Sequence, residues 1–198
     1  MKIVIFGAGG YSKEVADLVV ACGYGIAGFI DHLKEGLHEP TGLVISADLQ
    51  DHTADAASCA IGDVKARAAC WDRYAEAIPF HALVHPSASV SSYAFIGAGT
   101  QVLQYAVVNS QSRVGVNCIV NVGCIVAHDC VVGSHTHLAP GVSIGGAARV
   151  GERSFIGTGA IILPGVHIGS DCVVGAGSVV LADVGDKKRV VGVPAREI

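Results

Sequence analysis

The chain has 198 residues, of which 51% are hydrophobic and only 15% are charged, and its formal net charge is −4. This length allows one or two domains that each bury a core. The acidic balance lacks the basic surface typical of nucleic-acid binding. Gly, Pro, His and Ser interrupt the uncharged stretches before they reach the length of a membrane span. Neither nucleic acid nor insertion into a membrane is therefore expected.

The first segment of the chain predicts a strand, a glycine-rich loop and a helix. Lys2 to Phe6 is an apolar run typical of a buried parallel strand, and residues 7–10 (Gly-Ala-Gly-Gly) follow it as a loop. Ser12 is expected to cap a helix that runs to about Cys22. Backbone N–H groups at the start of such a helix can receive a phosphate. The alternative is a turn that merely needs glycine.

The next elements complete a small α/β domain. A second strand is predicted from Gly25 to Ile30, and Asp31 follows it at a distance from the loop that suits a hydrogen bond to a ribose or a base. Shorter strands over Leu43–Ile45 and Ser58–Ile61 precede a helix over Val64–Ala77. These strands are too few for a complete NAD-binding fold, but half of such a fold can hold one nucleotide.

Several polar residues lie in the loops of this domain. Gly62 and Asp63 follow the last short strand, at the edge where open α/β sheets bind ligands. His32, His38 and His52 are expected in polar loops without a function.

From Val84 to Val180 every sixth residue is aliphatic. The residue four positions later is small or β-branched, and glycine often follows the aliphatic residue directly, as in Ile96-Gly97. Neither a helical period of 3.6 nor simple alternation produces this pattern. A period of six predicts short strands joined by tight turns, three of which form one coil of a triangular parallel β-helix. The aliphatic side chains would fill the interior, and glycine would supply positive φ at the corners.

The cysteines predict a reducing compartment. Their number, seven, is odd, and four of them occupy the small-residue position of the repeat: Cys118, Cys124, Cys130 and Cys172. They are expected as reduced core side chains. The chain enters a strand directly after Met1, so no signal peptide is expected. Together these features predict a cytoplasmic location.

Polar side chains are rare in the repeat but cluster at Asn121, His128, Asp129, His135 and His137. His128 lies two residues after an aliphatic position, so its side chain should project from the wall. A carboxylate beside a neutral imidazole fixes its tautomer and increases its basicity, which suits removal of a proton from an amine or a hydroxyl. A surface histidine in a turn is the plainer alternative.

Taken together, the glycine-rich loop, the hexad repeat, the run from His128 to His137 and the ending Gly-Val-Pro-Ala-Arg (residues 192–196) resemble one family over essentially the whole chain. This is the bacterial nucleotide-sugar N-acetyltransferase and sialic acid O-acetyltransferase family of hexapeptide-repeat acyltransferases. The resemblance implies an α/β plus all-β fold, with a small Rossmann-like βαβ nucleotide-sugar-binding domain over residues 1–80. A left-handed parallel β-helix over residues 84–182 and a C-terminal tail over residues 183–198 would follow.

The resemblance also implies an activity and its residues. Acetyl-CoA would acetylate the amine of a UDP- or GDP-linked 4-amino-4,6-dideoxy sugar, with His128 as general base and Asp129 as its partner. Contacts with the acceptor would come from Gly9, Gly10, Tyr11, Asp31, Gly62, Asp63 and Asn121. Contacts with CoA would come from His137, Gly146, Thr158 and Ala176. The family implies no metal, and it packs three chains as a homotrimer with acetyl-CoA between neighbours.

Three positions depart from the family pattern and leave the sugar nucleotide open. Tyr11 stands where many members have histidine, His32 stands where some have a second acid, and His135 is not part of the shared motif.

Other functions are compatible with the same residues. O-acetylation of a sialic acid would use the same two domains. His128, Asp129, His135 and His137 are zinc ligands by type, so a β-helix zinc enzyme is an alternative, and a non-catalytic sugar-nucleotide-binding protein would need no base. An acyl-enzyme on Cys130 is not expected, because the repeat directs that side chain inward.

Overall fold

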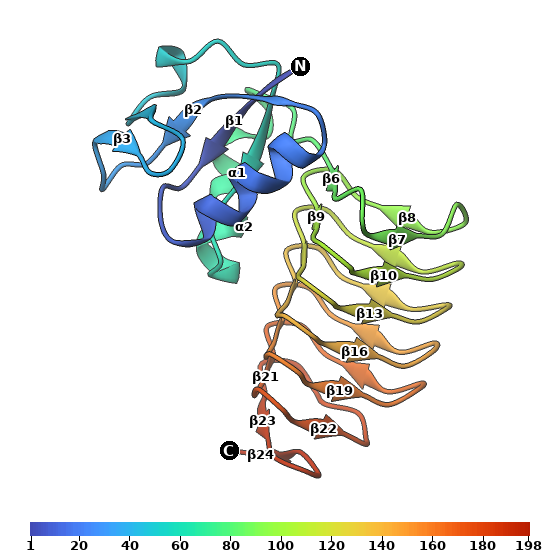
Figure 1. Ribbon diagram of the computed structural model, residues 1–198. Helices are drawn as coiled ribbons and strands as arrows, with labels where there is room; N and C mark the ends of the chain where they lie inside the picture. Colours follow the sequence, from blue (N-terminus) through green and yellow to red (C-terminus); the bar gives the residue numbers. More distant parts are fainter. The chain divides into compact units, whose positions relative to one another are not determined.

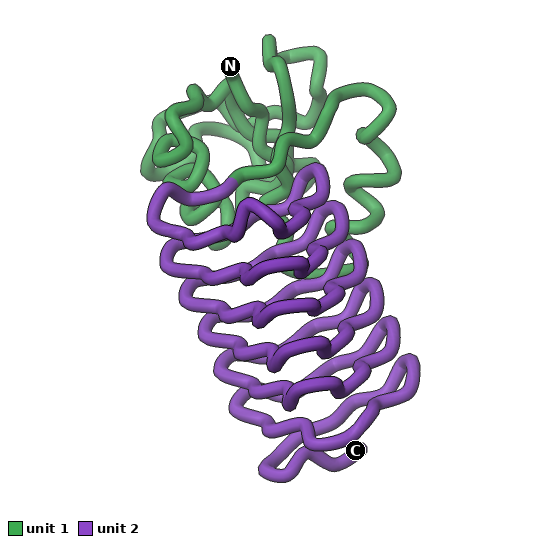
Figure 2. The backbone as a smooth tube through the Cα atoms, turned by 90° about the vertical axis from the view of Figure 1, so that its right-hand side faces the viewer, with its two compact units in different colours: residues 1–83 green, residues 84–198 purple.

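The computed structural model describes all 198 residues and divides into two compact units, residues 1–83 and residues 84–198 (Figure 2). The first unit is an α/β domain and the second is a left-handed β-helix with stacked coils (Figure 1). Neither helix, at 11 residues each, has the length or the unbroken apolar character that a bilayer span requires.

The α/β unit contains a five-stranded sheet in the order β3-β4-β2-β1-β5, in which only β3 runs antiparallel to its neighbour. Its elements are β1 (Lys2–Phe6), α1 (Tyr11–Ala21), β2 (Gly25–Ile30), β3 (Gly36–His38), β4 (Leu43–Ser46), the 3-10 turn η1 (Leu49–Asp51), β5 (Ala56–Cys59) and α2 (Val64–Tyr74). The apolar run of β1 is buried as predicted, because both faces of a central parallel strand are covered.

Some local predictions for this unit were wrong. Helix α1 begins at Tyr11 with Gly10 as its N-cap residue, so Ser12 lies inside the first turn and its Oγ donates to the carbonyl of Gly9. Strand β5 begins and ends two residues earlier than predicted, and α2 ends at Tyr74. His38 is buried, not in a polar loop, because its ring stacks on Phe29 with the ring centroids 3.7 Å apart.

The hexad pattern becomes a series of two-residue strands, each ending on one of the aliphatic positions. They are β6 (Leu83–Val84), β7 (Ser89–Val90), β8 (Phe95–Ile96), β9 (Gln101–Val102), β10 (Val107–Val108), β11 (Arg113–Val114), β12 (Ile119–Val120), β13 (Ile125–Val126), β14 (Val131–Val132), β15 (His137–Leu138), β16 (Ser143–Ile144), β17 (Arg149–Val150), β18 (Phe155–Ile156), β19 (Ile161–Ile162), β20 (His167–Ile168), β21 (Val173–Val174) and β22 (Val179–Val180). Each strand from β7 to β19 pairs in parallel with the strand three further on, so that Val126 lies opposite Ile144. The predicted fold class is confirmed.

Three sheets form the walls of the β-helix. The six-stranded sheet runs from β7 to β22, and the five-stranded sheet runs from β8 to β20. The eight-stranded sheet contains β6, β9, β12, β15, β18 and β21 and continues into β23 (Arg189–Val191) and β24 (Arg196–Glu197). Val190 of this tail joins the interior cluster and Ala195 packs against it.

The glycines that directly follow the aliphatic positions have a different purpose from the one predicted. They do not adopt positive φ. Instead, an added Cβ at Gly157 would lie 2.6 Å from the backbone nitrogen of Ala176 in the next coil. Positive φ occurs two residues later, at Gly159 and also at non-glycine residues such as Asp129. Close stacking of the coils therefore requires the first glycine, and turn geometry favours the second.

The small positions point inward and bind the neighbouring coil. Thr136 Oγ1 donates to the carbonyl of Gly151 at 2.9 Å, and the Cys118 and Cys130 thiols donate to the carbonyls of Gly133 and Gly145, both at 3.1 Å. These contacts explain why Ser, Thr and Cys share one position in the repeat, since each satisfies a carbonyl at a corner.

Candidate active site

His128 projects from the corner between β13 and β14, as the repeat predicted. Its side chain is 68% exposed, and Nδ1 lies 2.7 Å from Oδ2 of Asp129. Because a carboxylate only accepts, Nδ1 carries the proton and Nε2 is left as an acceptor. Asp129 has φ of 62°, a left-handed corner conformation that Asp tolerates better than most residues, and this turn places the carboxylate beside the ring.

Gly146 lies next to the same imidazole, one coil further on. An added Cβ at Gly146 would lie 2.8 Å from both Nε2 and Cε1 of His128. The ring therefore lies over backbone that is accessible only because residue 146 has no side chain. The N–H of Gly146 makes no hydrogen bond within the chain. His128, Asp129 and Gly146 form one group, which we call the base corner.

His137 and Asn121 lie elsewhere on the β-helix. His137 is in β15 of the eight-stranded sheet, is 9% exposed and packs edge-on against Phe155, with the ring centroids 5.2 Å apart. Asn121 follows β12 in the same sheet, and its backbone N–H donates to the carbonyl of Leu138. His128 lies at the corner between the six-stranded and five-stranded sheets. His137 and Asn121 therefore lie on a different side of the triangular coil from His128.

Thr158 and Ala176 mark the corner between the eight-stranded and six-stranded sheets. They occupy equivalent positions in consecutive coils, since Gly177 donates its N–H to the carbonyl of Thr158. With His137 and Asn121 they form a second group, the far group. Within one chain the width of the six-stranded sheet separates Thr158 and Ala176 from the base corner.

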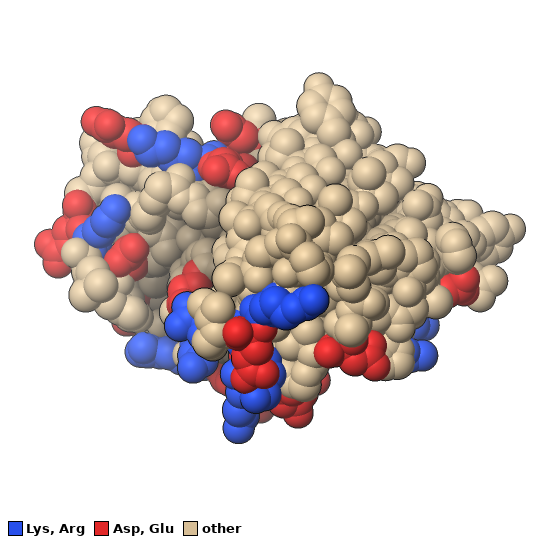
Figure 3. Space-filling view, turned by 90° about the horizontal axis from the view of Figure 1, so that it is seen from below, with Lys and Arg blue, Asp and Glu red and all other residues tan.

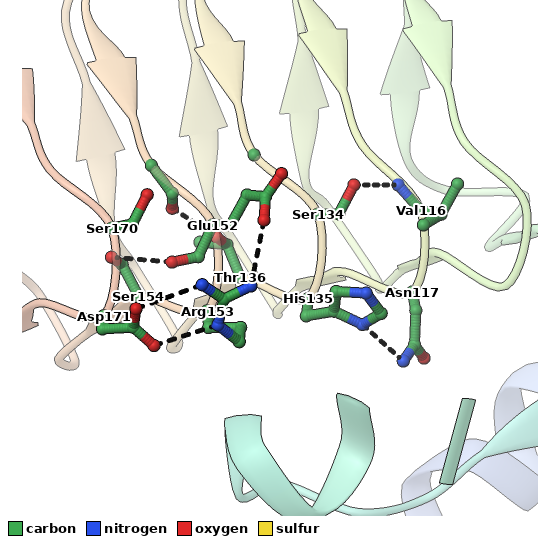
Figure 4. Close-up of polar contacts among 12 residues, drawn as sticks. Val116, Asn117, Ser134, His135, Thr136, Glu152, Arg153, Ser154, Ser170 and Asp171 are labelled. Atoms are coloured by element: carbon green, nitrogen blue, oxygen red, sulfur yellow. Dashed lines mark hydrogen bonds and ion pairs between the residues drawn. The ribbon is translucent and has the colours of Figure 1, made fainter. Parts of the chain in front are cut away.

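His135 belongs to a third corner and does not approach His128. It follows β14 with φ of 61°, and its Nδ1 lies 3.0 Å from Nδ2 of Asn117 in the preceding coil. Figure 4 shows this pair as part of a ladder of polar contacts that continues to Arg153 and Asp171, whose side chains lie 3.0 Å apart. The ladder links the turns of successive coils, so His135 has a structural role in holding adjacent coils together.

Two chemical alternatives can be compared with this geometry. Cys130 is fully buried and its thiol points into the interior, with a pKa raised by burial, so an acyl-enzyme on this residue does not fit. The histidines at positions 128, 135 and 137 lie on different sides of the coil, and no three His, Cys, Asp or Glu side chains converge on a point where they could hold a metal ion.

In the α/β unit, the loop after β1 is held by polar side chains on its inner side. Asp31 Oδ2 accepts from the N–H of Ala8 at 2.8 Å, and Oδ1 accepts from the N–H of Leu33 at 2.9 Å. The Ser12 hydroxyl binds the Gly9 carbonyl, and His38 Nε2 lies 2.8 Å from that hydroxyl. Asp31 therefore shapes the loop, in addition to any contact with a ligand.

Gly9 and Gly10 are open to an approaching ligand. No atom lies within 4 Å of an added Cβ at either residue, and their N–H groups make no hydrogen bond within the chain. Tyr11 differs, since its hydroxyl is in an interior environment where burial raises its pKa. The structure thus leaves the two glycines of this loop open to a ligand, whereas the Tyr11 hydroxyl is turned toward the interior.

A cavity of about 370 Å³ lies beside this loop. Gly7, Ile30, Asp31, His32 and Leu33 line one side of it, and Ile61, Ala66, Cys70, Arg73 and Tyr74 line the other. Gly62 and Asp63 lie in the loop between β5 and α2, where Asp63 Oδ1 accepts from Ala66 N–H as the helix N-cap. The α2 residues that line this cavity were not identified from the sequence, because the composition of an alanine-rich helix does not indicate which of its faces lines a cavity.

Comparison with known proteins gives this geometry a context. The PglD N-terminal domain family matches residues 2–74, and the bacterial transferase hexapeptide family (six repeats) matches residues 147–182. Over its whole length the chain superposes on PerB from Caulobacter crescentus in complex with CoA and GDP-perosamine, with a TM-score of 0.94, 35% identity and 97% of that chain covered.

The chain belongs to the nucleotide-sugar N-acetyltransferases of the hexapeptide-repeat family.

Two further relatives agree. The acetyltransferase domain of PglB from Neisseria gonorrhoeae in complex with acetyl coenzyme A has a TM-score of 0.94 and 34% identity, with all of this chain and 98% of that chain covered. The GDP-perosamine N-acetyltransferase of Escherichia coli O157:H7 is 29% identical over 157 residues, which are 72% of this chain and 69% of that protein. The family resemblance and the enzyme class that the sequence predicted are confirmed.

Proposed function

We propose that this acetyltransferase transfers the acetyl group of acetyl-CoA to the amine of a nucleotide-linked amino sugar, a GDP- or UDP-linked 4-amino-4,6-dideoxy sugar. The base corner is the observation that carries the proposal, since it presents an oriented imidazole on a β-helix of this family. The bound CoA and GDP-perosamine of PerB support the two substrates.

The chemical step is direct transfer from the thioester. The neutral amine attacks the thioester carbonyl, and His128 Nε2 takes the proton that the nitrogen loses as the C–N bond forms. The tetrahedral intermediate then breaks its C–S bond, and the imidazolium returns the proton to the departing CoA thiolate. Asp129 stabilises the imidazolium between these steps. No side-chain nucleophile is involved.

The oxyanion of that intermediate needs a donor close to the base. The N–H of Gly146 is a suitable candidate, because it has no partner within the chain and its residue lies against the imidazole. A fixed backbone dipole is an effective donor, since it needs no reorganisation during the reaction.

The acceptor would bind through the α/β unit. The N–H groups of Gly9 and Gly10 at the start of α1 are suited to the diphosphate. The neighbouring cavity is suited to the base, with apolar walls from Ile30, Ile61 and Ala66 and polar groups from Asp31 and His32 at its edge. Residues 1–80 would thus serve as the nucleotide-sugar-binding domain.

The position of the two groups on the β-helix supports a site shared between chains. One chain alone cannot bring the base corner and the far group together, because the six-stranded sheet separates them. In a closed ring of three chains, a corner of one β-helix can meet a different side of its neighbour. Acetyl-CoA would then lie between the two chains, touching Gly146 of one copy and His137, Thr158 and Ala176 of another.

The surface composition is compatible with such a homotrimer. The outward residues of the six-stranded sheet are uncharged and include Ile125 and Ile161, each 44% exposed. In the view of Figure 3 a broad surface carries no Lys, Arg, Asp or Glu. Extended uncharged walls of this kind favour burial against another protein surface. All seven cysteines are free thiols, which supports the cytoplasmic location that we also propose.

A thermal-shift screen with and without CoA, followed by turnover assays, tests the proposal. GDP- or UDP-linked amino sugars should raise the melting temperature and accept an acetyl group, with release of free CoA thiol. Stabilisation by sialic acid with no effect of nucleotides would instead favour O-acetylation. Binding of nucleotide-sugars without any acetyl transfer would contradict an enzymatic function and favour a binding protein.

A further inference from the structure

Arg67 is a fully buried cation in the α/β unit. It lies in the first turn of α2, is 1% exposed and is among the largest completely buried side chains of the chain. A guanidinium is costly to remove from water unless its N–H groups are hydrogen-bonded. Its burial therefore needs an explanation beyond the packing of an alanine-rich helix.

The guanidinium holds the loop between β5 and α2. Nη1 of Arg67 donates to the carbonyl oxygens of Ile61 at 3.0 Å and Gly62 at 3.1 Å. One side chain thus fixes two consecutive peptide groups. These residues follow the carboxyl end of β5, where open α/β sheets bind their ligands.

Fixing the carbonyls also fixes the direction of the N–H groups. In a trans peptide the N–H points away from the C=O of the same unit. Because the carbonyls of Ile61 and Gly62 point toward Arg67, the N–H groups of Gly62 and Asp63 point away from it. The N–H of Asp63, directly before α2, consequently faces the side opposite the guanidinium.

Arg67 also lies close to the glycine-rich loop. Burial raises the pKa of the Tyr11 hydroxyl, and the nearby positive charge of Arg67 opposes part of that rise. The two loops touch, since an added Cβ at Gly7 would lie 2.9 Å from the carbonyl oxygen of Ala60. A positive charge beneath two adjoining loops increases their attraction for an anion.

We infer that Arg67 is a positioning residue for the acceptor, which orients the backbone of the β5–α2 loop, including the N–H of Asp63, and supplies a buried positive charge beneath the diphosphate. It acts through backbone and need not touch the substrate. The inference rests on the proposed function and adds a residue that neither the glycine-rich loop nor the base corner includes.

The experiment compares Arg67→Lys and Arg67→Met with Lys65→Met. Lys65 is an exposed residue of the same helix, so its replacement removes the same charge without disturbing the loop. Steady-state kinetics would give KM separately for the nucleotide-sugar and for acetyl-CoA, and calorimetry would give the affinity of the folded protein for GDP and UDP.

We expect Arg67→Met to raise KM for the nucleotide-sugar and to weaken nucleoside diphosphate binding by about tenfold or more, with KM for acetyl-CoA nearly unchanged. Arg67→Lys should recover part of this loss, and Lys65→Met should resemble the parent enzyme. If Arg67→Met does not fold, Arg67→Lys carries the same comparison with a smaller shift.

Equal changes in both KM values, or none, would overturn the role of Arg67, as would a Lys65→Met effect equal to that of Arg67→Met. These results presuppose an active parent enzyme. A parent that binds nucleotide-sugars but transfers no acetyl group would contradict the proposed function alone, and the diphosphate affinities of the variants would still decide the role of Arg67.

Discussion

His128 is held from two directions, by the carboxylate of Asp129 beside it and by the backbone of Gly146 one coil further on. The first contact selects the tautomer and the second limits where the ring can lie. General bases depend on such positioning, because proton transfer requires the acceptor nitrogen within hydrogen-bond reach of the substrate. Replacement of His128 tests the base itself, and replacement of Gly146 tests the second contact.

Replacing His128 by Ala should lower kcat by about 10²- to 10⁴-fold, the usual contribution of a general base, with little change in folding because the side chain is exposed. Turnover assays on variants with matched melting curves measure this. His167→Ala removes another exposed histidine of the β-helix and serves as control. An His128→Ala enzyme that retains most of its activity would rule out the assigned base.

Gly146→Ala should reduce activity while leaving the fold intact. The new methyl group would lie 2.8 Å from His128 Nε2, so the ring must move from its place beside Asp129. We expect a loss of about tenfold or more in kcat, since small displacements of a catalytic group have large effects. Gly185→Ala is the matched control, because an added Cβ there meets no atom within 4 Å. Equal activity in both variants would show that the ring position is unimportant.

At the scale of elements, each turn of the hexad repeat has the same three requirements. An aliphatic side chain fills the interior, a small side chain beside it donates a hydrogen bond to the neighbouring coil, and the next residue must be small enough for the backbones of adjacent coils to stack. The six-residue period of the aliphatic positions predicted the strands of the β-helix, and the place of His128 within the repeat predicted that its side chain points outward. They misassigned the glycines after the aliphatic positions, because contact with a coil eighteen residues away is invisible in a local pattern. The buried His38 and its link to the glycine-rich loop were missed for the same reason.

The inward cysteines provide a test of this arrangement. Burial raises the pKa of the Cys124 thiol to about 11, and it also raises the pKa values of Cys130 and Cys172. At a pH below these pKa values the thiols stay protonated, and their burial keeps them inaccessible to reagents. At pH 8 a thiol reagent should react quickly with at most the partly exposed Cys22 and Cys70, and with all seven cysteines after unfolding. Rapid modification of Cys130 in the native protein would contradict its inward position.

At the scale of the whole molecule, the residues assigned to acetyl-CoA divide into two groups that one β-helix keeps apart. The sequence could predict both groups through family resemblance, but not their separation, because the sheet to which each residue belongs follows from the coiling. That separation is the physical reason to expect an active site between copies of the chain. A site shared in this way would link activity to assembly, so we expect a monomer to be inactive at any substrate concentration.

Complementation between two inactive variants tests this claim most directly. His128→Ala and His137→Ala would be co-expressed with different tags, and mixed trimers isolated and assayed. If His128 of one chain works with His137 of its neighbour, each isolated mixed trimer has about one site in three with both histidines intact, and its activity returns to about that fraction of the parent activity. Mixed trimers no more active than the separate variants, or a fully active monomer of the parent chain, would contradict a shared site.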